Sequence, residues 1–186
     1  MYKSLFFPVL LFIPSLVMAI DYGVTASFSA ASFDDPDGSN TGSLNSIDLN
    51  TSYDLRRRGQ SVIAGIGVLR GDASASDTAV NIDSSGYYVY SEYERRIPVF
   101  REFSETWLAI GGRFSVYDYT SRYTETFDGY LNESFNDRSE QSLEISGRIG
   151  YKINHARSIK SFPAVYIMYP ITGSVATYGL SYRVSF

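Results

Sequence analysis

The chain has 186 residues, with 20 acidic and 16 basic side chains and a net charge of −4. This acidic balance argues against a nucleic-acid-binding protein, which needs a basic surface to neutralise phosphates. The chain has no cysteine, which excludes a disulfide-stapled domain and a lipid anchor on an N-terminal cysteine.

Residues 1–19 have the composition of a secretory signal peptide. Lys3 supplies a positive start, an apolar stretch follows, and a small-x-small cleavage motif ends at Ala19. We expect cleavage between Ala19 and Ile20. The mature domain is then residues 20–186. Because Lys3 is removed with the leader, this domain has 15 basic and 20 acidic side chains and a net charge of −5.

A single membrane helix is the alternative interpretation of the leader. Its apolar stretch, residues 5–17, is shorter than the roughly 20 residues that a helix needs to cross a bilayer. It also contains Pro8 and Pro14, which disfavour a regular helix. No later stretch is apolar for about 18 residues, so we expect no membrane helix in the mature domain.

Aromatic residues are abundant in the mature domain and recur in short alternating runs. The chain holds 16 tyrosines and 12 phenylalanines. In the first run, Tyr22, Val24, Ala26 and Phe28 alternate with small polar residues, which is the period of a strand with one apolar face. The same reasoning predicts eight strands, over residues 22–30, 46–55, 61–70, 86–94, 106–116, 142–153, 163–170 and 177–186.

Two of these runs are less regular than the rest. Residues 61–70 are apolar on both phases, and Gly65 and Gly67 indicate that one side of this strand is crowded. The run from Pro163 to Pro170 is bracketed by prolines, which strands tolerate at their ends and edges.

The strand predicted over residues 86–94 has no unique apolar face. Tyr88 and Tyr90 lie on one phase, and Tyr87, Val89 and Tyr93 lie on the other. The phase of this strand therefore stays open.

The connections between the strands alternate in length and charge. Those after the first, third and fifth strands are long and acidic, whereas those after the second, fourth and sixth are shorter and rich in Arg and Lys. In an up-and-down meander, alternate connections lie at opposite ends. Long loops at one end and tight turns at the other are typical of a transmembrane β-barrel.

A soluble, lipocalin-type barrel has the same period, with its apolar face directed inward around a ligand. The polar face favours the membrane barrel instead, because its charges are mixed with Gly and Ser and of both signs, as a narrow lumen of paired side chains needs. The charged residues on that face are Asp48, Asp54, Arg113, Glu144, Arg148 and Arg183.

Aromatic residues near the strand ends support the same choice, because they are expected where lipid meets water. One girdle is predicted from Tyr22, Tyr53, Trp107, Tyr151 and Phe186, and the other from Phe28, Phe33, Tyr117, Tyr119 and Tyr169. The predicted fold is therefore all-β: an eight-stranded, antiparallel, up-and-down transmembrane β-barrel whose surroundings are outer-membrane lipid. An even number of strands places both ends of the domain on the periplasmic side and the acidic loops outside.

The last ten residues carry a family resemblance. Tyr178, Leu180, Tyr182, Val184 and Phe186 alternate with polar residues up to a terminal aromatic. This chain resembles the small eight-stranded outer-membrane barrels of Gram-negative bacteria, of the OmpA transmembrane-domain and OmpX type. The resemblance implies that these five residues form the signal read by the barrel-assembly machinery, and that the protein lies in the cell outer membrane.

Three lumen residues are expected to lie close together. If the hairpin between the fifth and sixth strands turns near Asp128 and Gly129, then Arg113 falls close to Glu144, within reach of a bidentate contact, and Arg148 lies four residues further along the same face of that strand. A gated pore is one interpretation of this network. We favour a structural plug, because side chains just fill an eight-stranded barrel.

The segment from residue 119 to residue 140 is the longest connection. Alternating Tyr123, Phe127 and Tyr130 predict strands that extend beyond the membrane as a hairpin. An exposed strand edge can recruit a surface or envelope protein by β-augmentation. A solvated hairpin without a partner is the alternative, and the sequence leaves both open.

The sequence therefore favours a non-enzymatic function: an outer-membrane barrel that presents acidic, Tyr-rich loops for surface interaction or envelope integrity. A narrow channel and a lipid A-modifying enzyme are the alternatives. The single histidine, His155, lies in a predicted turn and lacks the His-x-Ser spacing that lipid A deacylases would require. Asp35, Asp37 and Asn40 depart from the calcium-loop motif, so no metal or other cofactor is predicted.

Overall fold

The computed structural model describes residues 20–35, 38–55, 59–74, 80–97, 105–127, 130–155 and 158–186. The predicted signal peptide, including Ala19, lies outside these residues. The strands are β1 (Ile20–Asp35), β2 (Gly38–Asp54), β3 (Gln60–Ser74), β4 (Val80–Arg96), β5 (Thr106–Phe127), β6 (Tyr130–Tyr151), β7 (Ile153–Asn154), β8 (Lys160–Thr172) and β9 (Val175–Ser185). Within the described ranges, no helix is long and apolar enough to cross a membrane.

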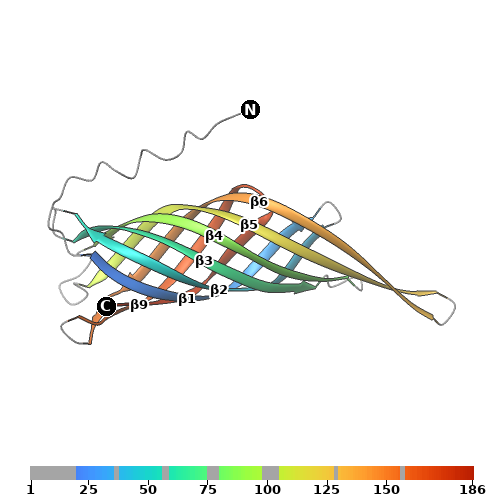
Figure 1. Cartoon of the computed structure of the whole chain (residues 1–186), viewed down its shortest axis with the longest axis horizontal. Coiled ribbons are helices and arrows are strands. Elements are labelled where there is room, and N and C mark those ends of the chain that lie inside the picture. The colour runs from blue at the N-terminus through green and yellow to red at the C-terminus, as the bar shows by residue number, and fades with distance from the viewer. Residues whose placement is uncertain are drawn as a thin grey trace, which may run out of the picture.

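The strands form one closed antiparallel barrel (Figure 1). Each strand from β1 to β6 pairs with the next, β9 pairs with both β8 and β1, and the β6–β8 pairing closes the ring. β7 is a two-residue continuation of β6 against β8, so the ring contains eight strands. The predicted eight-stranded up-and-down barrel is confirmed. Closure satisfies the backbone hydrogen bonds that lipid cannot satisfy.

β1 begins and β9 ends at the same end of the barrel, which we call the termini end. The backbone N–H of Tyr22 donates to the carbonyl of Phe186, and the N–H of Phe186 donates to the carbonyl of Tyr22. The opposite end carries the β5–β6 hairpin, which projects well beyond the other strands (Figure 1). We call it the hairpin end.

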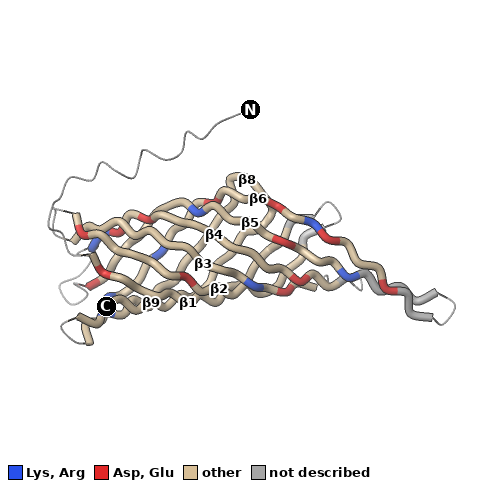
Figure 2. Tube along the Cα trace, in the orientation of Figure 1, with Lys and Arg blue, Asp and Glu red and all other residues tan. Residues whose placement is uncertain are grey.

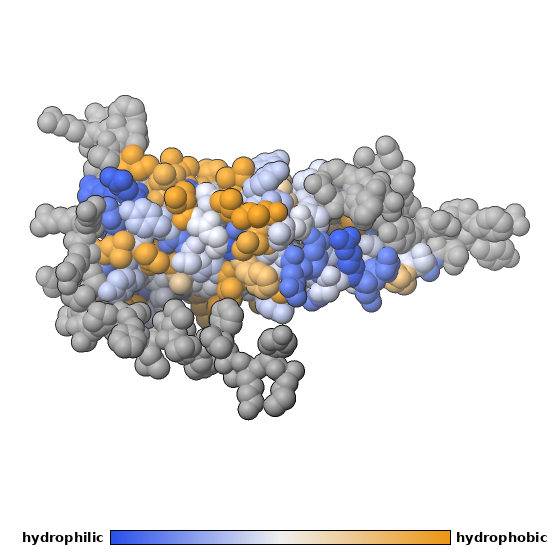
Figure 3. All heavy atoms as spheres, turned by 90° about the horizontal axis from the view of Figure 1, so that it is seen from above, coloured by the Kyte–Doolittle hydropathy of each residue, from blue (hydrophilic) through white to orange (hydrophobic). Residues whose placement is uncertain are grey.

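The outer wall of the barrel is an apolar belt. Exposed apolar side chains occur at alternate positions on every strand of the ring, including Phe28, Leu49, Ile66, Val89, Ile110, Ile145, Ile167 and Leu180. Figure 3 shows apolar residues over much of the wall and hydrophilic residues towards the projecting hairpin. Exposing this belt to water would be strongly unfavourable in free energy, whereas the hydrocarbon of a bilayer accommodates it.

The sequence did not show which face of β4 points into the lumen, and the structure shows it. Tyr88 and Tyr90 are buried inside, while Tyr87, Val89 and Tyr93 are exposed on the outer wall. The same phase directs Glu92 and Glu94, also buried, into the lumen.

Two glycines of β3 make room for the β4 tyrosines. A Cβ atom on Gly65 would lie 2.5 Å from the ring of Tyr90, and one on Gly67 would lie 2.5 Å from the ring of Tyr88. The crowded side that was predicted for this strand is therefore the lumen side.

The predicted girdles are wrong for four aromatic residues. Phe33, Trp107, Tyr117 and Tyr119 are buried inside the barrel. All four occupy odd positions on β1 or β5, and the outward side chains of those two strands occupy even positions. Alternation decides the direction of a side chain in a strand, so closeness to a strand end does not bring an inward residue to the interface. Tyr22, Phe28, Tyr151, Tyr169 and Phe186 are exposed as predicted.

The crowding at Gly67 provides a test of the inward packing. We expect Gly67→Val to destabilise the barrel by about 1–3 kcal/mol, because overpacking forces neighbouring atoms apart. Here the new Cβ atom would also lie 2.7 Å from the Ile47 carbonyl oxygen, which cannot swing away. Urea titration of the folded, unboiled band in electrophoresis measures the change. Gly112→Val is the matched control, because its Cβ atom would meet nothing nearer than 3.6 Å. Equal losses from both variants would contradict this packing.

Candidate functional site

An ion pair between β5 and β6 lies at the centre of the lumen. Arg113 and Glu144 are directly opposite in the strand register, and the Arg113 Nε–H donates to Glu144 Oε2. Tyr117 donates its hydroxyl to Glu144 Oε1 at 2.6 Å, and Ser115 donates to Glu144 Oε2 at 3.2 Å. The Glu144 side chain is 0% exposed, so these donors replace the water that a carboxylate needs.

The other two lumen arginines pair with β4. Arg148 lies 3.4 Å from Glu92, and Arg183 donates to both carboxylate oxygens of Glu94 at 3.0 Å. The structure therefore brings Arg113 and Glu144 together and places Arg148 on Glu92. Sequence reasoning missed Glu92 and Glu94 because the phase of β4 was open.

Asp48 of β2 is held by neutral donors. Tyr90 and Tyr88 donate their hydroxyls to it at 2.8 and 3.1 Å, and the Asn50 amide donates at 2.9 Å. Tyr88 also lies under the Arg113 guanidinium, whose carbon is 4.8 Å from the ring centre. Asp48 is therefore part of one continuous polar layer with the ion pair.

Apolar side chains fill the lumen on the hairpin side of this layer. Phe33 and Tyr119 pack edge to face with their ring centres 6.1 Å apart, and Tyr117 stacks on Tyr119 at 5.8 Å. Leu44, Leu69, Ile82 and Val175 are buried in the same cluster. A cavity of about 20 Å³ lies among the polar side chains, which is room for about one water molecule. This packing favours the plug over an open pore.

The β5–β6 hairpin is the largest feature outside the barrel wall. Its register runs without interruption from Thr106↔Tyr151 to Phe127↔Tyr130. Charged residues occur along its length as well as along the strands of the barrel (Figure 2). On the wall side, β4 accompanies β5 as far as Val80↔Tyr123.

The other edge of the hairpin is open over most of its projecting length. In the described ranges, β8 pairs with β6 only from Leu143 to Gly150. The β8–β9 turn covers the next few residues, because Ser142 donates to the Thr172 carbonyl at 2.7 Å and Ser174 donates to Glu140 at 2.8 Å. Residues 130–139 of β6 therefore form an edge without a paired strand in the described structure, and we call them the β6 edge.

Cross-strand contacts hold the outer surface of the hairpin. Thr120 donates its hydroxyl to Asp137 at 2.9 Å, and the Arg122 guanidinium lies 5.4 Å from the ring centre of Phe135. Phe135 is nevertheless 58% exposed.

The residues predicted for surface interaction lie at the tip of this hairpin. The backbone places Tyr123 opposite Ser134, and Phe127 opposite Tyr130. The side chains of these three aromatic residues lie outside the described part of the structure.

The residues predicted as the assembly signal lie on β9 and immediately after it. Tyr178, Leu180, Tyr182 and Phe186 are exposed on the outer wall, and Val184 shares their phase. Their strand completes the ring by pairing with β1. Ile20, on the other side of the predicted cleavage site, is the first residue of β1.

His155 makes a contact that its sequence context did not reveal. Its Nε2 lies 2.7 Å from the Ser161 hydroxyl, but Ser161 is only 1% exposed. A nucleophile must reach its substrate, and this hydroxyl cannot. Among the described residues, no group of three or more His, Cys, Asp or Glu could hold a metal ion.

No protein-family model matches the chain, and no curated protein matches it. Its fold is similar to that of Neisserial surface protein A, with 16% identity, a TM-score of 0.50 and coverage of 89% of this chain and 97% of that chain. It is also similar to the translocator domain of the autotransporter NalP from Neisseria meningitidis, with 5% identity, a TM-score of 0.54 and coverage of 90% and 88%. Ail, the attachment invasion locus protein of Yersinia pestis, matches with 14% identity, a TM-score of 0.49 and coverage of 89% and 98%.

These similarities concern the fold, which is that of small outer-membrane barrels. The exposed apolar belt and the fold agree with the outer-membrane location predicted from the sequence.

The buried ion pair provides a stability test. We expect Glu144→Leu to lower the free energy of unfolding by about 3–5 kcal/mol, because it leaves Arg113 charged and unpaired in a dry lumen. Adding Arg113→Met should restore at least half of the loss, since no unpaired charge then remains. Trp107 is the single tryptophan of the chain and is buried in the lumen, so its fluorescence during urea titration in micelles reports unfolding. A double variant as unstable as the single one would contradict the pairing.

Proposed function

We propose that this chain, a closed eight-stranded barrel with the fold of small outer-membrane proteins, holds its β5–β6 hairpin outside the cell as a docking element for another protein. The protein is non-enzymatic in this proposal, and the barrel is its anchor in the outer membrane. The observation that carries the proposal is the β6 edge, an open strand edge on a hairpin whose two strands are paired along their whole length.

An open edge is suited to β-augmentation. The backbone N–H and C=O groups of this edge that point away from β5 lack strand partners in the described structure, and an extended segment of another protein can complete the ladder. Residues 133–139 are exposed along this edge. Because β4 and β6 both support β5 at the base, the hairpin is pre-organised and loses little conformational entropy on binding.

Charge and side chains indicate what kind of segment fits. The edge carries Glu133 and Asp137 against one base, Arg138, and Phe135 offers an exposed apolar anchor. An extended segment with basic and aromatic residues complements this surface, since opposite charges steer association. The predicted contact residues Tyr123, Phe127 and Tyr130 would add aromatic contacts at the tip.

The two alternative functions have less support. A lipid A hydrolase would need an accessible nucleophile beside its base, and the Ser161 hydroxyl next to His155 is buried. A channel would need a continuous aqueous path, and the lumen is filled by the polar layer and the apolar cluster beyond it.

Shortening the hairpin tests the proposal. Replacing residues 121–136 with Asn-Gly joins Thr120 to Asp137, a cross-strand pair, through a two-residue turn of the kind that hairpins prefer. We expect this variant to reach the membrane and fold, because only the pairings of residues 80–82 with β5 are lost from the ring of strands, but to lose its partner. The measurement is a cross-linking pull-down from intact cells, compared with the full-length barrel.

A control separates strand docking from general attraction to acidic loops. Asp83→Asn removes an exposed acid from the neighbouring β4 and should leave the captured protein unchanged. If the shortened variant still captures the same partner as the full-length barrel, the hairpin is not the docking element.

A further inference from the structure

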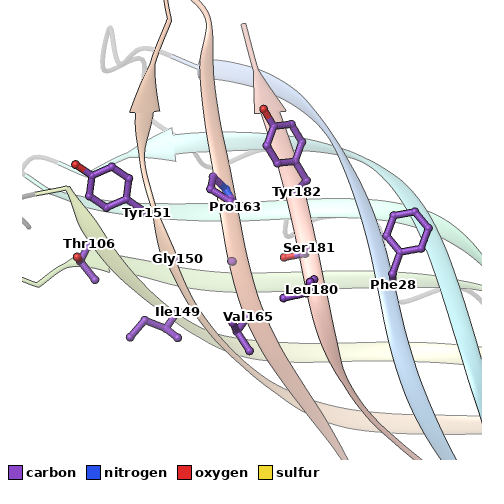
Figure 4. Close-up of a pocket in the computed structure, with 11 residues that line it drawn as sticks. Phe28, Thr106, Ile149, Gly150, Tyr151, Pro163, Val165, Leu180, Ser181 and Tyr182 are labelled. Carbon is purple, nitrogen blue, oxygen red and sulfur yellow. The ribbon is translucent and has the colours of Figure 1, made fainter.

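A hollow of about 600 Å³ lies on the outer wall of the barrel, near the termini end. It crosses β6, β8 and β9 (Figure 4). Its apolar wall is one continuous row in the strand register, in which Ile149 pairs with Val165, Val165 with Leu180, and Leu180 with Phe28. All four side chains belong to the apolar belt, so hydrocarbon rather than water surrounds them.

A proline creates the depth of the hollow. Pro163 takes the outward position on β8, next to Tyr182 in the register. Figure 4 shows the rings of Tyr151 and Tyr182 on either side of Pro163, with their hydroxyl groups directed away from Ile149 and Val165. The compact pyrrolidine ring therefore leaves a gap between two large side chains.

Beyond the hollow, towards the termini end, the barrel wall becomes polar. Ser161 lies two residues before Pro163 and so faces the same wall, about 7 Å further along the strand. Its side chain is buried, and the ring of the exposed residue His155 contacts its hydroxyl, with Nε2 at 2.7 Å. This contact engages Nε2 and leaves Nδ1 as the ring atom for a ligand. Phenol groups of Tyr151 and Tyr182 line the hollow itself, and the imidazole lies beyond them along the same wall.

We propose that this hollow is a binding site for a phospholipid of the membrane leaflet at the termini end. One acyl chain fills the gap above Pro163 and packs on Val165 and Leu180. The phosphate group lies at the level of the tyrosine hydroxyls and His155, which donate hydrogen bonds to its oxygens. An amphiphile matches the sequence of surfaces from apolar wall to polar border, and it is already the surrounding medium.

A second hollow, on the β1–β4 side of the barrel, provides a natural comparison. It has about the same volume, 560 Å³, and similar apolar walls that include Ala64 and Ile66. It has no imidazole at its border, because His155 is the only histidine of the chain. Tyr22 supplies a phenol group there as well, so the proposed site differs from the second hollow in the nearby imidazole rather than in size.

Native mass spectrometry of the folded barrel tests the site. The barrel is released from detergent that contains palmitoyl-oleoyl phosphatidylethanolamine, and retained lipid molecules are counted. We expect the wild-type barrel to retain one molecule. Pro163→Phe, which fills the gap, should weaken retention at least tenfold. Ala64→Phe, the matched change in the second hollow, should leave retention unchanged.

The polar border is tested separately. His155→Ala should weaken retention of the phospholipid several-fold but not retention of palmitoyl-oleoyl glycerol, which lacks the phosphate. Equal effects on both lipids would overturn the role of His155. The position of the unboiled band confirms folding of each variant, and Val165→Trp fills the same hollow if Pro163→Phe does not fold. Three results would overturn the site: the wild-type barrel retains no lipid, Ala64→Phe loses as much lipid as Pro163→Phe, or two copies of the barrel associate in the spectrometer without any bound lipid.

Discussion

The requirement that every backbone N–H and C=O group inside a bilayer has a partner within the protein governs this structure. The chain meets it by closing eight strands into a ring. The β6–β8 and β1–β9 pairings complete that ring. Closure then fixes two surfaces at once, because the side chains of each strand alternate between them. The outer wall has to be apolar, and the inside has to be filled.

The narrow inside explains the polar chemistry of the barrel. Charged groups are expensive to bury, so each carboxylate is placed among donors: Glu144 on Arg113, Glu94 on Arg183, and Asp48 on two tyrosines and an amide. The apolar cluster on the hairpin side completes the filling. Such a lumen stabilises one register of the strands, because a slip by one residue would turn its charges towards lipid.

Where the barrel leaves the lipid, the requirement for closure ends, and the sheet opens. β5 and β6 continue as a two-stranded ladder while β8 and β9 turn back at Thr172. The backbone of the β6 edge can be satisfied by water there, or by a partner strand. At the termini end, Pro163 lines a hollow in the barrel wall, and the pair His155–Ser161 lies beyond it along the same wall.

Much of this architecture was determined by the sequence alone. Strict alternation in residues 142–153 determined which face of β6 meets lipid. The approximate position of the hairpin turn was sufficient to place Arg113 close to Glu144, because an antiparallel register follows from its turn. Only the closed barrel decided the phase of β4, where tyrosines occupy both faces. Gly65 and Gly67 accommodate Tyr90 and Tyr88, and Asp48 accepts their hydroxyls. Those glycines and that carboxylate lie on neighbouring strands, so the sequence of β4 alone does not determine which of its faces points inward. The burial of Phe33, the pairing of Glu92 and the contact of His155 with Ser161 likewise depend on more than the sequence of one strand.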